Sequence, residues 1–106
     1  MSEKEFIQAP AGGFALPPVH PGEILAEEIE ARGMNAHSPA LRLRVPANRI
    51  GAIMAGKRGL TAETALRIGR HFGTGAAFWM TLQSQYALAI ALRDMGERIA
   101  AEVAAA

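Results

Sequence analysis

The sequence predicts an all-α domain, and two observations carry that prediction. Apolar residues recur at helical spacing in segments separated by glycine, proline and N-capping residues, and no segment alternates convincingly as a strand. The chain has 106 residues, of which 50% are hydrophobic and 20% charged, as expected of one globular domain. Such a chain buries roughly 60–70% of its unfolded surface, which is enough for a small helical core. We therefore expect five helices, the last of them long.

A non-helical arm is expected before the first helix. Residues 1–18 contain two stretches that cannot hold a helix, Ala9-Pro10-Ala11-Gly12-Gly13 and Pro17-Pro18. We therefore divide the chain into a flexible N-terminal arm, 1–18, and a helical domain with a C-terminal dimerisation helix, 19–106.

The first helix is expected to start at His20-Pro21-Gly22-Glu23 and to run to about Ala31. Proline suits the first turn, and the glutamates lie toward the positive end of the helix dipole. Gly33 is expected to end the helix. The expected inward residues are Ile24, Leu25 and Ile29, with Glu27 and Glu30 outward.

The signals for the second helix conflict. Asn35 is a good N-cap, but Pro39 would then occupy the fifth position and delete a backbone hydrogen bond. Alternatively, Ser38 is the cap and Pro39 the first residue of a very short helix that ends at Arg44. Of the two, we expect the shorter helix.

The third and fourth helices have clearer ends. The third is expected from Pro46 or Ala47 to Ala55, and the fourth from a Thr61 cap to Phe72. Gly73 is the expected terminator of the fourth helix. The expected inward residues are Ile50, Ile53 and Met54 of the third helix and Ala65, Leu66 and Ile68 of the fourth.

The final helix, from Ala76 to about Ala101, carries more apolar surface than one small domain can cover. Phe78, Trp79, Leu82 and Tyr86 can pack back on the other helices, but the segment 86–92 is apolar on every side. Four short helices cannot surround such a helix, and a second copy of the chain is the simplest cover. We therefore expect a homodimer with interface residues Leu88, Ile90, Leu92 and Met95.

The near-neutral net charge of +1 hides a strong charge asymmetry. Residues 32–72 carry eight cations against one acid, Glu63, whereas residues 1–31 have a net charge of −5 and the remainder −1. A polyanion should be attracted to the middle of the chain and repelled from its start.

The third helix and the basic turn after it have the architecture of a helix that enters the DNA major groove. Ala47, Asn48 and Arg49 lie at its N-terminal end, where Asn can bond adenine and Arg can bond guanine. The alternative is that these residues are only a solvated helix face followed by a basic loop. The residues expected to contact DNA phosphates are Arg44, Lys57, Arg58 and Thr61.

Other functional classes find no support in the sequence. There is no cysteine, and the three histidines do not form a metal-ligand pattern. No nucleophile with a base and no phosphate-binding glycine loop is present, so neither an enzyme, a cofactor nor a metal site is expected. No apolar run approaches the roughly 18 residues of a membrane span, and the start lacks signal-peptide features. We expect a cytoplasmic protein.

These segments, in this order, resemble the HigA family, which comprises plasmid-maintenance antidotes of the XRE (Cro/cI-like) helix-turn-helix class. The resemblance covers roughly residues 19–92 and rests on several blocks in fixed order. The blocks are His20-Pro21-Gly22-Glu23-Ile24-Leu25, Val45-Pro46-Ala47-Asn48-Arg49-Ile50, Gly56-Lys57-Arg58-Gly59-Leu60-Thr61, Thr64-Ala65-Leu66-Arg67-Ile68, Phe72-Gly73-Thr74 and Phe78-Trp79-Met80-Thr81-Leu82-Gln83, with Tyr86 beyond.

The resemblance implies a five-helix, lambda-repressor-like fold and dimeric binding to a palindromic operator in double-stranded DNA. It also implies neutralisation of a co-encoded HigB-type toxin, an mRNA-cleaving ribonuclease. By position, the recognition residues would be Ala47, Asn48 and Arg49, with Lys57 and Arg58 on the DNA backbone. A stand-alone XRE-type transcriptional regulator, or a protein-interaction module with a degenerate helix-turn-helix, would have the same fold.

The departures from the family pattern cluster in and around the second helix. Asn35-Ala36 stands where the family usually has Ser-Gln, and Pro39 where it has a leucine. Arg44 stands at a glycine position, so a positive backbone φ angle is expected there, at a cost of roughly 1 kcal/mol. Ala47 replaces a more usual polar residue. These changes bear on DNA affinity more than on the fold.

Overall fold

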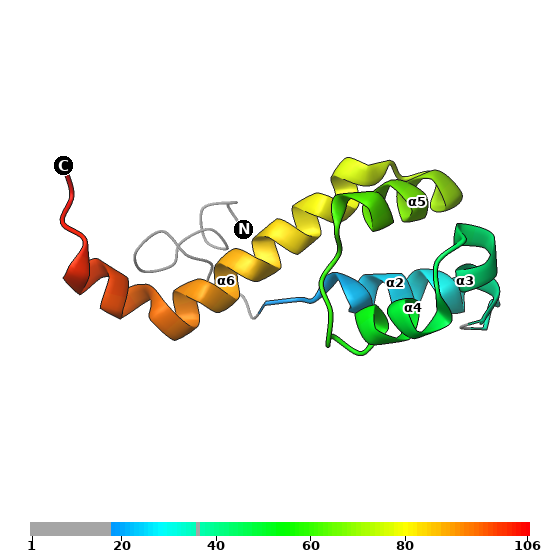
Figure 1. Cartoon of the computed structure of the whole chain (residues 1–106), viewed down its shortest axis with the longest axis horizontal. Helices are drawn as coiled ribbons and strands as arrows, with labels where there is room; N and C mark the ends of the chain where they lie inside the picture. Colours follow the sequence, from blue (N-terminus) through cyan, green and yellow to red (C-terminus); the bar gives the residue numbers. More distant parts are fainter. Residues whose placement is uncertain (1–17, 36) are drawn as a thin grey trace, which may run out of the picture. The chain divides into compact units, whose positions relative to one another are not determined.

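The structure, a computed structural model, describes residues 18–35 and 37–106, and these form five α-helices and no strand (Figure 1). The all-α fold class predicted from the sequence is therefore confirmed. The predicted arm, 1–18, lies outside the described residues except for Pro18. The helices are α2 (Pro21–Ala31), α3 (His37–Leu43), α4 (Ala47–Met54), α5 (Ala62–Phe72) and α6 (Ala76–Glu102).

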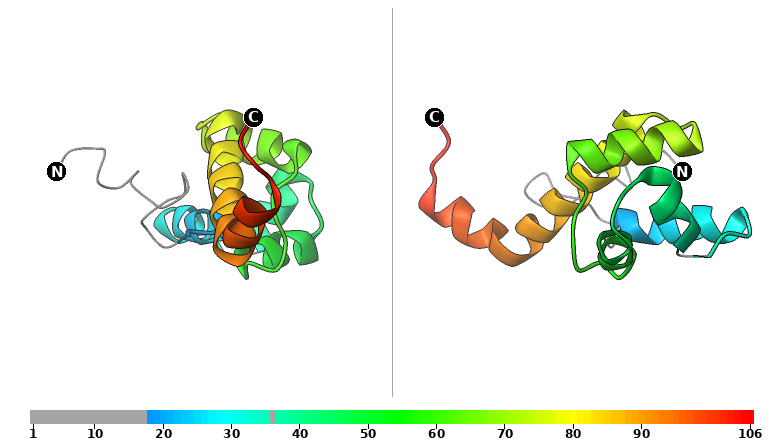
Figure 2. Two further views of the ribbon diagram at one scale, coloured as in Figure 1. Left: turned by 90° about the vertical axis from the view of Figure 1, so that its left-hand side faces the viewer. Right: turned by 45° about the vertical axis from the view of Figure 1, so that its right-hand side comes forward.

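The chain divides into two compact units within α6: one spans Val19–Ser84, and the other contains Gln85–Ala106. The first unit holds α2 to α5 and the start of α6, and Figure 2 shows these helices in two further views. In this unit α2 packs on α4, and α3 packs on both α4 and α5. Each of these helices turns an apolar side to one core. The buried hydrophobic residues are Leu25, Ile29, Ala40, Leu43, Val45, Ile50, Ile53, Leu60, Ala65, Ile68, Phe72 and Trp79.

A glycine allows α2 and α4 to approach each other closely. A Cβ atom added to Gly22 would lie 1.8 Å from the carbonyl oxygen of Ile53 in α4. The amide of the same glycine donates to Nδ1 of His20, the N-cap of α2, at 2.9 Å. The position of α4 against the core therefore depends on a residue without a side chain at the start of α2.

Three helices end in the same hydrogen-bonded turn, in which the residue after the cap has a positive φ angle. At the ends of α2 and α4 this residue is a glycine, Gly33 with φ +66° and Gly56 with φ +76°. After α3 it is Arg44, whose φ angle is +58°. The amide of Arg44 donates to Leu41 O and that of Val45 to Ala40 O, which are the two bonds of a Schellman turn. The positive φ expected at Arg44 is confirmed.

The expected start of the second helix was wrong. Helix α3 begins at His37, two residues before Pro39, and the side-chain oxygen of Asn35 accepts the Ser38 amide at 3.1 Å. Asn35 therefore takes the capping role. Pro39 is the third helical residue, and no amide in the first turn has an acceptor inside the helix, so its missing N–H removes no helical bond. The helix ends at Leu43 and not at Arg44.

The predictions for the other helices hold at their ends but not at every side chain. Thr61 caps α5, and Gly73 ends it in the left-handed conformation, as expected. Leu66 was wrongly placed inward: it is 63% exposed, because it lies on the side of α5 opposite Ile68 and Phe72. Phe78 is 44% exposed and covers the edge of the buried Trp79 ring, with ring centroids 5.2 Å apart.

The second unit contains α6 from Gln85 onward. Leu88, Met95, Ile99 and Val103 are exposed large apolar side chains of this segment. Ile90 and Leu92 are half-buried. Within the described part of the chain, no helix combines the length and the apolar character that a membrane span requires.

Candidate nucleic-acid interface

The first turn of α4 presents the three residues predicted to contact bases. Ala47 and Asn48 are exposed and Arg49 is half-buried. Pro46 is the N-cap, and its carbonyl accepts the amides of Arg49 and Ile50. Because Ile50 is fully buried, this short helix is anchored by its inner face while its polar N-terminal end faces outward. Ala47 contributes no hydrogen-bonding side chain.

The outer face of α4 is open beyond its first turn. Gly51 is exposed, and a Cβ atom added there would meet no other atom within 4 Å. The absence of a side chain leaves room for a second surface to approach the helix backbone closely. The major groove of DNA is wide enough to admit an α-helix, and a helix without a side chain at this position can approach it closely.

The turn after α4 carries two exposed cations, Lys57 and Arg58. Among the described residues, neither has an ion-pair partner. The turn leaves the helix through Gly56, and the amide of Lys57 donates to Ala52 O at 2.9 Å. The backbone of this turn is therefore tied to α4, while the two cationic side chains are available to an anion.

Gln83 of α6 holds the other end of this basic turn. Its Oε1 accepts the amide of Leu60 at 2.7 Å, and a Cβ atom on Gly59 would lie 2.9 Å from the same oxygen. Gln83 is not among the site residues predicted from the sequence. Its only signal was a place in the block that starts at Phe78, because a contact between residues 23 positions apart leaves no local pattern.

Thr61, predicted to contact a phosphate, already has hydrogen-bond partners. Its hydroxyl oxygen accepts the Thr64 amide at 3.3 Å, which caps α5, and donates to the Thr64 hydroxyl at 3.2 Å. A phosphate would have to compete with Thr64 for the hydroxyl proton. The exposed Thr61 is therefore a weaker phosphate candidate than Lys57 or Arg58.

Two of the eight cations in the basic segment serve the fold. Arg32 pairs with Glu28 and lies over the Phe72 ring, 4.6 Å from its centroid. Arg67 pairs with Glu63 at 3.1 Å and donates to the carbonyl of Leu43 at 3.1 Å, at the end of α3. The other six have no ion-pair partner among the described residues: Arg42, Arg44, Arg49, Lys57, Arg58 and Arg70.

The predicted DNA-contacting residues thus lie around one short helix. Arg44 is exposed in the turn before α4, Asn48 and Arg49 lie on its first turn, and Lys57 and Arg58 follow its last turn. Helix α4 has eight residues and is about 12 Å long. Exposed cations at both ends of a helix with a polar N-terminal turn form an arrangement that fits a groove between two phosphate backbones. Among the described residues there is no cluster of metal-ligating side chains.

Comparison with known proteins gives the family. The chain is 45% identical over 86 residues to virulence-associated protein I of Dichelobacter nodosus, a match covering 80% of each protein. It is similar to the solved structure of an addiction module antidote protein of the HigA family from Coxiella burnetii. The identity is 44% and the TM-score 0.82, over 86% of this chain and 100% of the other.

A second solved structure, the Pseudomonas aeruginosa antitoxin HigA with the higBA promoter, is 40% identical, with a TM-score of 0.81. The match covers 83% of this chain and 97% of that one. No family model matches the sequence. The two structural similarities extend over nearly the whole of the compared chains at high identity. The chain therefore belongs to the HigA family of antitoxins, with an XRE-type helix-turn-helix formed by α3 and α4.

Proposed function

We propose that this protein is a DNA-binding antitoxin that represses its own operon by occupying a palindromic operator. The observation that carries the proposal is the exposed first turn of α4, with exposed and unpaired cations before and after the helix. The Pseudomonas aeruginosa relative, whose structure includes a promoter, supports the same mode of action. Steric occlusion of the promoter is sufficient for repression and requires no other activity of the protein.

In this proposal α4 enters the major groove with its N-terminal turn toward the base edges. Asn48 bonds an adenine and Arg49 a guanine, while Ala47 allows close approach. Lys57 and Arg58 hold phosphates at one end of the helix, and Arg44 at the other. Thr61 lies at the start of α5, where the hydroxyl and backbone N–H groups can donate to a further phosphate.

A dimer places two such helices about 34 Å apart, so that they read successive major grooves on one face of the duplex. The proposed interface consists of apolar residues of α6: the exposed Leu88 and Met95 and the half-buried Ile90 and Leu92. A dimer would bury side chains that the single chain leaves in contact with water. Twofold symmetry of the protein then corresponds to a palindromic operator.

Membership of the HigA family supports a second activity, the neutralisation of a HigB-type ribonuclease toxin by direct contact. An antitoxin of this kind binds two partners, DNA and protein. The two activities need different surfaces if the toxin–antitoxin complex is also to bind the operator.

Operator binding is tested by fluorescence anisotropy of the purified protein on its own upstream DNA, from about 50 to 300 mM salt. We expect tight binding, a steep dependence of log affinity on log salt, and a clear preference over scrambled DNA. Weak binding without preference would mean that the changes at Pro39, Arg44 and Ala47 have removed the DNA function. The chain would then be a protein-interaction module of the same fold.

A further inference from the structure

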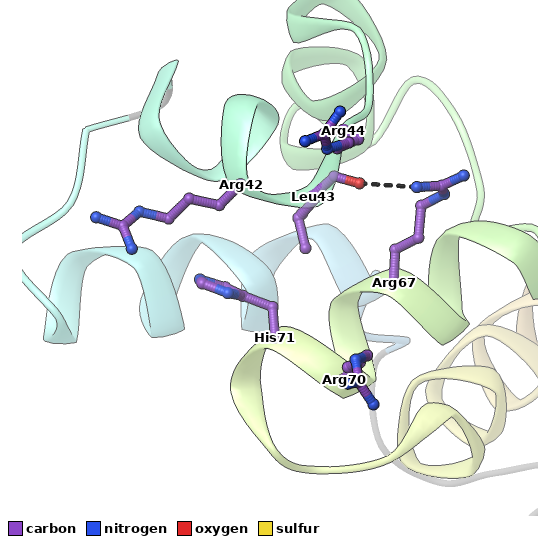
Figure 3. A pocket seen from close by; sticks show the side chains of 6 residues that line it. All are labelled: Arg42, Leu43, Arg44, Arg67, Arg70 and His71. Carbon is purple, nitrogen blue, oxygen red and sulfur yellow. Dashed lines mark hydrogen bonds between the residues drawn. The ribbon is translucent and has the colours of Figure 1, made fainter.

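The end of α3 and the C-terminal half of α5 enclose an open pocket of about 400 Å³ in which every polar side chain is basic. Figure 3 shows Arg42, Leu43 and Arg44 at the end of α3 opposite the residues of α5. No residue of this pocket other than Arg44 belongs to the proposed DNA contacts. The lining residues are Arg42, Leu43, Arg44, Arg67, Arg70 and His71.

One of these arginines is occupied and three are not. Arg67 is held by Glu63 and by the carbonyl of Leu43. Arg42, Arg44 and Arg70 have no ion-pair partner among the described residues. Like charges gathered around one pocket repel each other in the free protein, and a bound anion removes that repulsion. Binding of an acidic ligand in this pocket is therefore favoured electrostatically.

The backbone conformation of Arg44 also supports a binding role for this pocket. An arginine with φ +58° costs on the order of 1 kcal/mol relative to glycine, and such strain concentrates where a side chain has a task. The Schellman turn itself needs only a residue that tolerates positive φ. Because glycine would form the same turn without strain, the arginine at this position indicates a role for its side chain.

Exposed leucines flank the cations, and these favour a protein ligand over a nucleic acid. Leu41 is 79% exposed and lines a second depression together with Arg44. Leu66 is 63% exposed and lies one turn before Arg70 on the same face of α5. A phosphate backbone gains nothing from leucine, whereas an apolar side chain of a peptide does. Arginine is also enriched at protein–protein interfaces.

The spread of the guanidinium groups favours an extended ligand. Figure 3 shows Arg42, Arg44 and Arg70 pointing to different sides of Leu43, so one small anion would not reach all three. Arg70 is also nine residues from Thr61 along the chain, about 13 Å along α5 from the end that would contact DNA. A chain segment with several carboxylates can span these positions, each pairing with one arginine.

We infer that this pocket is a second binding site, which takes an acidic protein segment that carries several carboxylates and apolar side chains between them. The inference rests on the proposed antitoxin function, for which the pocket provides a protein-binding surface that shares only Arg44 with the proposed DNA contacts. Arg42 and Arg70 bind carboxylates, Arg44 stands between the pocket and the depression beside Leu41, and the leucines contact the apolar side chains of the segment.

The test uses the full chain and a fluorescein-labelled peptide of sequence Glu-Glu-Leu-Glu-Glu-Leu, measured by anisotropy at low salt. Operator affinity is measured on the same samples. We expect Arg42→Ala and Arg70→Ala each to weaken peptide binding about fivefold or more and to leave operator binding within about twofold. Arg58→Ala, the matched control, should do the opposite. Arg67 is left intact because it caps α3.

A separate measurement tests the apolar part of the site. Leu41→Ser, or a peptide with serine in place of leucine, should weaken peptide binding about threefold or more. Equal binding in both cases would overturn the assignment to a protein segment. A loss of operator affinity in Arg70→Ala would overturn it as well, since the pocket would then belong to the DNA footprint.

Two further outcomes separate this inference from the proposed function. If the protein binds the peptide through Arg70 but does not bind its operator, the result would support the inferred binding pocket and contradict the proposed DNA function. Operator binding together with peptide binding that is lost only in Arg58→Ala would support the DNA function. It would overturn the pocket, because the peptide would merely occupy the DNA surface.

Discussion

The side-chain oxygen of Gln83 accepts the backbone N–H of Leu60 at 2.7 Å, and this bond ties the first turns of α6 to the loop that carries Lys57 and Arg58. Leu60 is buried directly after the loop, so the loop is anchored on both sides: by Gly56 at the end of α4 and by Gln83 at its far end. Gln83 is not itself one of the residues predicted to contact DNA. It positions the backbone from which two cations extend.

Gln83→Ala should therefore weaken DNA binding through loop order. We expect a loss of about three- to tenfold in affinity for all sequences, because the released loop must be ordered again on binding. The slope of log affinity against log salt should stay unchanged, since no phosphate contact is removed. Gln85→Ala, an exposed glutamine two residues later, is the matched control and should leave affinity unchanged. A reduced slope in Gln83→Ala would mean that Gln83 itself contacts the backbone.

Substitutions of Arg49 and Lys57 should change DNA binding in different ways. Arg49→Ala removes a base contact, so discrimination between the operator and a variant base pair should fall by about 1–3 kcal/mol. Lys57→Ala removes a phosphate contact, so binding should weaken on every sequence and the salt slope should fall by about 1. Anisotropy titrations on matched and mutated operators at several salt concentrations separate the two. If neither substitution changes binding, α4 is not the recognition helix.

Arg44→Gly should stabilise the fold. Its φ angle of +58° is strained for arginine and relaxed for glycine, so we expect a gain of about 0.5–1 kcal/mol in the free energy of unfolding. Thermal unfolding should show a rise in Tm of a few degrees. Arg42→Gly provides the contrast: it removes the same charge within helix α3, and it should destabilise by a similar amount. A fall in Tm for Arg44→Gly would show that the arginine side chain contributes more than the strain costs.

Leu88→Glu should break the proposed dimer. It places a carboxylate at an exposed apolar position of α6, where burial against a second copy would cost several kcal/mol. Sedimentation should show a monomer, with operator affinity reduced because two half-sites are no longer bound together. Arg93→Glu, at an exposed position of the same helix that already bears a charge, should remain dimeric. An unchanged dimer in Leu88→Glu would locate the interface elsewhere.

Local chemistry accounts for the features that the sequence predicted correctly. Pro21 and Gly73 mark helix ends by their backbone preferences, and Thr61 does so by its side-chain cap, so these ends of α2 and α5 followed without knowledge of the fold. The positive φ at Arg44 followed from the family resemblance, because Arg44 stands where the family usually has a glycine. The buried Ile50 and Ile53 followed from helical spacing.

The sequence by itself therefore determined the helical fold class, most helix ends and the set of exposed cations around α4, because each depends on residues close together in the chain. Only the tertiary structure decided that Leu66 faces water, that Gln83 holds the basic loop, and that Arg42 and Arg70 share one pocket. The side of α5 that meets the core is set by its neighbours, and the contacts of Gln83 and Arg70 join segments more than 20 residues apart. Spacing along a sequence carries no record of such contacts; the packing of the helices creates them.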